Sequence, residues 1–309
     1  MKITKLFAAS VVVAAAVGCQ GSDQPAPGEK PKPAFEDTSA LFTQNVEAKF
    51  KSKILGGELV VLPGVFWPGE AETTVLPLMR ENRGIFPNKV VLEIGTGSGA
   101  AGVYAAKLGA SKVVVTDINP NAIASARRNA KAFGVQDVVE ARLVSADDIS
   151  AFAVIPSNEK FDVILSNPPY SLDLDAPKND AVTDTGDLGF SIVDGLDEHL
   201  KPGGRAMLFY GSLFYHMVMV KYATYSGFEV RSHRPFTMTR WEASVLFNSY
   251  LRRLLETRGV DPDAFRFSYR EKALNIHFKP IGKEPPLVEG SDSERRWGGW
   301  MVIRRPSGA

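Results

Sequence analysis

A short apolar segment that runs straight into a glycine-rich turn lies within the first third of this sequence. Residues 89–94, KVVLEI, have the continuous apolar pattern of a strand buried in a parallel sheet. Residues 95–99, GTGSG, follow without a break, and residues 100–108 predict a helix. A strand, a glycine turn and a helix in this order form the unit that opens doubly wound α/β folds.

The alternation of strands and helices continues along the chain. Further strands are predicted at Lys112–Asp117, Val138–Val144, Phe161–Ser166, Arg205–Tyr210 and Phe228–Ser232. Helices are predicted at Ala71–Asn82, from the N-cap Asn119 to Gly134 and at Ser212–Ser226, with a turn at Lys201–Gly204. This spacing predicts the α/β fold class, with a doubly wound, mostly parallel seven-stranded sheet and ligands at the carboxyl ends of its strands.

The segment after Arg234 is less regular. Thr239–Glu242 is a capping box that predicts a helix to about Arg258, and Ala273–Phe278 and Trp300–Arg304 predict two strands. We expect one of these two strands to be an antiparallel seventh strand at the edge of the sheet.

The first forty residues differ in composition from the rest. Lys2 and Lys5 precede a largely apolar run from Leu6 to Gly18, which is too short to span a bilayer and is typical of a signal peptide. The residues that follow, rich in Pro, Gly and charge, predict a flexible tether. We therefore expect a signal peptide at 1–18, a tether at 19–40, the main domain at 41–235, and at 236–309 a C-terminal α+β extension that completes the sheet edge.

Composition excludes several classes of protein. A chain of 309 residues allows one large domain with additions, and 36 Lys and Arg against 35 Asp and Glu demand no nucleic-acid partner. The one cysteine, Cys19, excludes a disulfide framework and a thiolate cluster. The four histidines lack the spacing of a metal site, so we expect no metal.

The glycine turn is the first candidate for ligand binding. Glycines between a strand and a helix let the backbone approach a ligand closely. Gly97, Gly99 and Gly102 also fit the dinucleotide pattern, although that register starts two residues beyond the strand. Asp117 ends the next strand, where a carboxylate can accept both hydrogen bonds of a ribose diol.

The second candidate is Ser166-Asn167-Pro168-Pro169-Tyr170, at the carboxyl end of the fourth strand. Two prolines forbid continuation of the strand, and the amide oxygen of Asn167 and the carbonyl of Pro168 can point at one spot. Two acceptors converging on an NH2 group orient its nitrogen toward an electrophile, and Tyr170 offers a face for stacking. The alternative is an ordinary turn, for which Asn-Pro-Pro is also suited.

Together these residues carry a resemblance to a known family. Leu92-Glu93-Ile94 with Gly95, Gly97 and Gly99 resembles motif I of the class I methyltransferases, which are Rossmann-like enzymes that depend on S-adenosyl-L-methionine (S-adenosylmethionine). Asn-Pro-Pro-Tyr is similar to the signature of amino-methyltransferases that act on adenine, cytosine, guanine or glutamine nitrogen. Pro68–Thr73 resembles a segment of release-factor glutamine methyltransferases, and ribosomal RNA guanine methyltransferases share the same core.

The resemblance implies a function and a set of site residues. The expected activity is N-methyl transfer from S-adenosylmethionine to a planar amino or amide nitrogen of a protein or nucleic acid. Asn167, Pro168 and Tyr170 would lie at the chemistry. The cofactor would be held by Glu93, Gly95, Thr96, Gly97, Gly99, Asp117 and Asp147, with Asp148 as an alternative to Asp147 or either acid capping a turn.

The N-terminus adds an expectation about location. Ala16-Val17-Gly18-Cys19 resembles the lipobox of bacterial lipoproteins, which implies a lipid anchor on Cys19 and attachment to a membrane of the cell envelope. The alternative is a cytoplasmic protein with a short N-terminal helix packed on the domain.

Two other functions stay open at this point. One is an NAD(P)-dependent oxidoreductase that uses the Gly97 register, and the other is a non-catalytic envelope lipoprotein that keeps the fold as a binding module.

Overall fold

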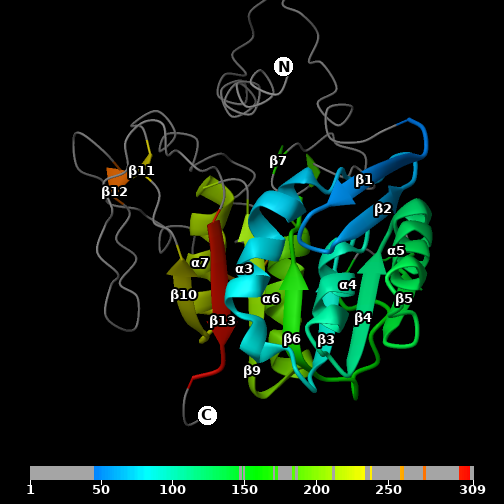
Figure 1. The fold of residues 1–309 in the computed structure, drawn as a ribbon. Helices are drawn as coiled ribbons and strands as arrows, with labels where there is room; N and C mark the ends of the chain where they lie inside the picture. Colours follow the sequence, from blue (N-terminus) through cyan, green and yellow to red (C-terminus); the bar gives the residue numbers. More distant parts are fainter. Residues whose placement is uncertain are drawn as a thin grey trace, which may run out of the picture. The chain divides into compact units, whose positions relative to one another are not determined.

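The computed structural model describes residues 45–145, 148, 150–169, 171–172, 183–184, 187–210, 213–233, 237–238, 258–260, 274–275 and 299–306 (Figure 1). Contacts divide the chain into two units. The larger unit comprises Ser39–Arg234 and Lys279–Ala309, and the smaller comprises Met1–Thr38 and Pro235–Phe278. In the smaller unit the described strands are β11 (Thr237–Met238) and β12 (Leu274–Asn275), which pair antiparallel.

Seven strands form the central sheet of the larger unit, in the order β10-β13-β9-β6-β3-β4-β5 (Figure 1). Their bounds are β3 Val90–Ile94, β4 Lys112–Asp117, β5 Val139–Leu143, β6 Phe161–Ser166, β9 Leu200–Tyr210, β10 Glu229–His233 and β13 Gly299–Arg304. Neighbours among β3, β4, β5, β6 and β9 pair in parallel, whereas β13 runs antiparallel to both β9 and β10. The predicted doubly wound, mostly parallel seven-stranded sheet is confirmed.

The structure corrects three local predictions. The antiparallel strand β13 lies between β9 and β10, one position inside the edge at which we expected it. The predicted turn Lys201–Gly204 lies within β9, where the pairing with β6 is irregular and Gly203 has a φ of 72°. The predicted helix Ala71–Asn82 is divided into the π-helix η2 (Ala71–Val75) and α3 (Leu76–Glu81), which the 3-10 helix η3 (Arg83–Ile85) follows.

Helices cover the sheet, and their apolar residues complete the hydrophobic core that the strands begin. Figure 1 shows α3 in front of the sheet, and α7 (Leu213–Tyr225) lies behind β10 and β13. Alternate apolar residues of the central strands pack against α3, α4 (Ala100–Lys107) and α5 (Pro120–Ala132), and this core includes Val91, Val115, Leu165, Met79, Val103 and Ala126. The remaining described helix of the larger unit, α6 (Asp187–His199), packs on α7 and β9.

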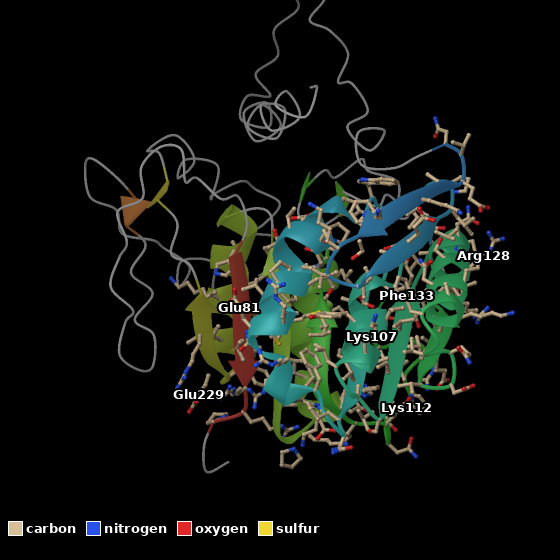
Figure 2. All side chains as sticks on the ribbon, viewed as in Figure 1. Glu81, Lys107, Lys112, Arg128, Phe133 and Glu229 are labelled. Atoms are coloured by element: carbon tan, nitrogen blue, oxygen red, sulfur yellow. The ribbon has the colours of Figure 1, made fainter. Side chains whose placement is uncertain are left out.

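A β-hairpin comes before the first strand of the central sheet in the sequence, and the sequence patterns did not predict it. Strands β1 (Ala48–Ser52) and β2 (Gly57–Val61) pair antiparallel, and a separate pair, β7 (Ser171–Leu172) and β8 (Thr183–Asp184), follows β6. The Nζ of Lys107 in α4 donates to the carbonyl oxygen of Leu55 at 2.6 Å and lies 5.2 Å from the ring centroid of Phe133 (Figure 2). The hairpin is therefore tied to the helices that cover the sheet.

The described residues contain neither a transmembrane helix nor a metal cluster. None of their helices is long and apolar enough to cross a membrane. No group of three or more His, Cys, Asp or Glu among them is arranged to hold a metal ion. The predicted helix at Thr239–Arg258, except for its last residue, and most of the strand at Ala273–Phe278 lie outside the described residues.

Candidate active site

The order of the strands brings the two candidate loops to neighbouring positions. The chain runs from β3 outward to β4 and β5, and then returns to the other side of β3 as β6 and β9. Strands β3 and β6 are neighbours, with Ile94 level with Ser166. In doubly wound sheets such a reversal leaves a crevice at the carboxyl ends of the two strands, where ligands bind.

One cavity at this reversal joins both loops. It is lined by the glycine turn after β3, by Asp117 at the end of β4 and by Asn167–Pro169 after β6. Apolar residues complete the wall, among them Phe66 and Phe209. A molecule bound at the glycine turn and another bound at the Asn-Pro-Pro segment would therefore lie in the same cavity.

The conformation of the turn depends on its glycines. Gly95, Gly97 and Gly99 have φ values of 72°, 53° and 82°, in the left-handed region. The N–H of Gly95 donates to the carbonyl oxygen of Thr116 at 2.9 Å, which fixes the turn to β4. A Cβ at Gly99 would lie 2.7 Å from the Cα of Ala126, so the turn packs closely on α5 there. A Cβ at Gly95 would meet nothing within 4 Å, so space for a ligand remains beside this part of the turn.

Glu93 is buried beneath the turn and fastens it to α4. Its Oε2 accepts hydrogen bonds from the Oγ1 of Thr96 at 2.6 Å and from the N–H of Gly102 at 2.8 Å. Burial raises the pKa of Glu93 from 4.5 to about 8, against the opposing effect of these hydrogen bonds. The buried position therefore disfavours the charged form of this carboxyl group when no cation lies beside it.

Asp117 lies on the other side of the turn. Its Oδ2 accepts the N–H of Gly97 and its Oδ1 accepts the N–H of Asn119, each at 2.9 Å. Burial raises the pKa of Asp117, and hydrogen bonds from the backbone N–H groups of Asn119, Gly97 and Ile118 partly offset this effect. Each oxygen keeps acceptor capacity for a ligand, since a carboxylate oxygen accepts more than one hydrogen bond.

The Asn-Pro-Pro segment begins where β6 ends. The Oγ of Ser166 donates to the carbonyl oxygen of Ile94 at 2.8 Å, and this bond fastens the end of β6 to β3. Asn167 is half-buried, Pro168 is buried, and both line the cavity. Pro168 and Pro169 lack the N–H groups that would continue the ladder, so the chain leaves the sheet at this point.

The ionisable residues of the cavity determine which ligand charges it favours. Among the described residues that line it, Glu93 and Asp117 carry ionisable acids and none is Lys or Arg. Such a lining favours a ligand with neutral or positive groups over one with several phosphates.

Comparisons with known proteins decide the family. Residues 58–168 match the family model for ribosomal protein L11 methyltransferase (PrmA). A candidate protein N5-glutamine methyltransferase of Methanocaldococcus jannaschii is 35% identical over 169 residues, which cover 52% of this chain and 79% of the relative. The chain belongs to the class I S-adenosylmethionine-dependent methyltransferases. A release factor glutamine methyltransferase of Cereibacter sphaeroides is similarly 32% identical over 204 residues, or 59% of this chain and 70% of the relative.

Membership of the methyltransferase family makes S-adenosylmethionine the cofactor, and the cavity fits it. The cofactor carries an ammonium group, a sulfonium and a ribose diol, and the cavity presents two carboxyl groups beside an open glycine turn. The alternative of an NAD(P)-dependent oxidoreductase gains no support. Its glycine pattern would begin at Gly97, which lies beyond the end of β3.

Three of the predicted site residues of this methyltransferase, Cys19, Asp147 and Tyr170, lie outside the described residues. Asp148, the alternative to Asp147, is exposed and does not line the cavity. Its Oδ1 accepts the N–H of Ser150 at 3.2 Å, as expected for an acid that caps a turn.

The sequence patterns missed the loop that closes one side of the methyltransferase cavity. Phe66 and Pro68, between β2 and η2, line the cavity. The Nδ2 of Asn119 donates to the carbonyl oxygen of Gly64 at 2.9 Å and thereby holds this loop against the start of α5. The composition of residues 63–69, PGVFWPG, was the available signal, because its prolines and glycines are typical of a loop.

Proposed function

We propose that this methyltransferase methylates the side-chain amide nitrogen of a glutamine in a protein. The observation that carries the proposal is the shared cavity, in which Asn167 and Pro168 lie beside the glycine turn. The two glutamine methyltransferases named above support the choice of acceptor, because this chain covers most of the length of both.

Catalysis in this proposal is positioning of the acceptor. The amide oxygen of Asn167 and the main-chain carbonyl of Pro168 would each accept one N–H of the acceptor amide, and would aim its nitrogen at the glycine turn. Tyr170 would stack on the planar amide. Bound S-adenosylmethionine supplies a methyl group that its sulfonium already activates, so the site requires no strong general base.

The cofactor would be held by residues on both sides of the turn. Asp117 would accept the hydroxyl groups of the ribose diol, and Glu93 would face the ammonium end directly or through water. Asp147 would contact the adenine amino group.

The acceptor class can be tested with labelled cofactor. The purified chain is incubated with methyl-labelled S-adenosylmethionine and cell fractions, and the products are treated with protease or ribonuclease. We expect label in protein, recovered after hydrolysis as methylated glutamine. Label that ribonuclease releases would replace glutamine with a nucleobase as the acceptor.

Asn167→Ala tests the role of the Asn-Pro-Pro segment. We expect methyl transfer to fall by at least about a hundredfold, because one of the two oriented acceptors is lost, while the dissociation constant for S-adenosylmethionine changes little. Gln136→Ala is a matched control, since Gln136 is an exposed side-chain amide outside the cavity. Unchanged transfer in Asn167→Ala would refute the assignment.

For the location of the protein we propose export and lipidation at Cys19. This proposal rests on the sequence of residues 1–40 alone. Cys19→Ala should move the protein from the membrane fraction to the soluble fraction and abolish incorporation of labelled fatty acid. An unchanged membrane fraction would contradict it.

A further inference from the structure

Asn129 is a fully buried side-chain amide in α5, and it makes three hydrogen bonds. Its Oδ1 accepts the N–H of Val60 in β2 at 2.7 Å. Its Nδ2 donates to the carbonyl oxygen of Val60 at 2.9 Å and to the carbonyl oxygen of Ser98 at 2.8 Å. Both protons of the amide nitrogen and the amide oxygen are thus engaged.

The Ser98 contact reaches the glycine turn from α5. Ser98 lies between Gly97 and Gly99, the two glycines that complete the turn. One helical turn before Asn129, Ala126 packs directly against Gly99. The turn therefore rests on α5 through two adjacent points, one a close backbone contact and the other a hydrogen bond.

We propose that Asn129 is a positioning residue for the cofactor. It holds the carbonyl of Ser98, and with it the N–H of Gly97 that faces Asp117, in the conformation that S-adenosylmethionine requires. Through Val60 the same amide also joins the turn to the β1–β2 hairpin, so that cofactor binding stabilises the docking of the hairpin.

The chemistry of the site selects asparagine. An aspartate would keep an acceptor for Val60 but would lose both donors and leave the carbonyl of Ser98 unsatisfied in a buried position, which is costly. An alanine would leave all three backbone groups without their partner. Both substitutions therefore release the turn, and Asn129→Asp does so with almost no change of shape.

Ser125 provides a matched control one helical turn away. It is also fully buried, and its Oγ accepts the N–H of Leu62 at 3.1 Å. Ser125→Ala therefore weakens the docking of the segment that follows β2 on α5, but it removes no contact to the glycine turn.

Calorimetric titration of the purified full chain with S-adenosylmethionine tests the proposal without knowledge of the acceptor. We expect Asn129→Asp and Asn129→Ala to raise the dissociation constant about tenfold, and Ser125→Ala to change it less than about twofold. The stoichiometry separates this role from misfolding, because an irreversibly misfolded fraction lowers the number of sites and leaves the affinity of the remaining molecules unchanged. Unchanged affinity in both Asn129 variants, or an equal loss in Ser125→Ala, would overturn the proposal.

Hydrogen exchange gives a second readout in the absence of cofactor. The amide of Gly97 should exchange faster in Asn129→Asp than in Ser125→Ala, and equal rates would contradict the proposal. If neither Asn129 variant folds, the wild-type protein still tests the proposal. We expect S-adenosylmethionine to slow the exchange of the two Nδ2 protons of Asn129. No slowing would overturn the proposal.

Discussion

Glu93 has a buried carboxyl group, and burial makes its charged form energetically unfavourable. Burial raises its pKa from 4.5 to about 8 in the folded protein, while the unfolded chain keeps the ordinary value. Between these two pH values the folded state holds a proton that the unfolded state has released. The contribution of Glu93 to stability is therefore full below pH 4.5 and is lost as the pH rises toward 8.

Glu93→Gln should remove this pH dependence. Glutamine is neutral at every pH, and its amide oxygen can accept the N–H of Gly102 while Thr96 turns to accept from the amide nitrogen. We expect the free energy of unfolding, measured by urea titration without cofactor, to fall from pH 4.5 to 8 in the wild type and to stay flatter in the variant. Parallel curves for the two proteins would contradict the assignment.

Residues at strand ends could be predicted, but their partners could not. The carboxyl ends of the first, second and fourth predicted strands gave Glu93, Asp117 and Asn167, because parallel strands end at one edge of a sheet. The contact between Asn129 and Ser98 depends on how α5 packs against the glycine turn, so no local sequence pattern predicts it.

Among the elements, α4 packs tightly against the sheet at Gly102. A Cβ at this position would lie 2.5 Å from the Cγ1 of Val115 in β4 and 2.8 Å from the Oε2 of Glu93. The missing side chain thus sets the distance between helix and sheet, and with it the hydrogen bond from Gly102 to Glu93.

Gly102→Ala should destabilise the protein although alanine is the better helix former. We expect a loss of about 1–3 kcal/mol from overpacking, against a gain of at most about 1 kcal/mol from helix propensity. Gly84→Ala is the control, because a Cβ there meets nothing within 4 Å and its φ is not in the left-handed region. Denaturant midpoints of the two variants measure the difference, and equal midpoints would refute the packing argument.

Strands with a continuous apolar run were predicted, whereas the β1–β2 hairpin and the first residues of β9 were not. The continuous apolar runs of β3, β4 and β6 identified them as buried strands. In β1 exposed Lys49 and Lys51 flank Phe50, and five residues give too short an alternation to indicate a strand. In β9 the residues Lys201–Gly204 have the composition of a turn, and only the pairing with β6 shows that an irregular strand accommodates them.

At the scale of the whole molecule, a cluster of ion pairs joins β4, β5 and the segment before β6. Arg142 donates to both carboxylate oxygens of Glu159, at 2.6 and 3.1 Å, and Lys112 lies 2.8 Å from Glu159. Figure 2 shows Lys112 toward the end of the sheet away from β1 and β2. The hydrogen bond from Arg142 lowers the pKa of Glu159, so its contribution to stability is present at neutral pH and is lost on acidification.

Glu159→Gln should lower the free energy of unfolding by about 1–2 kcal/mol at pH 7 and make it less sensitive to acid. Glu140→Gln should have a smaller effect, because its side chain is 48% exposed and solvent screens its pair with Arg142. Urea titrations from neutral pH down to about pH 4 compare the variants, and an acid response in Glu159→Gln as steep as that of the wild type would contradict this role.

The insertion of β13 between β9 and β10 sets the order in which the protein can be completed during synthesis. Strands β3 to β9 can pair as they emerge, whereas β10 has no neighbour in the sheet until β13 arrives. All the residues between His233 and Gly299 must be made first. A chain interrupted before residue 299 would therefore lose two strands from its sheet and leave the edge of β9 open to pairing with other chains.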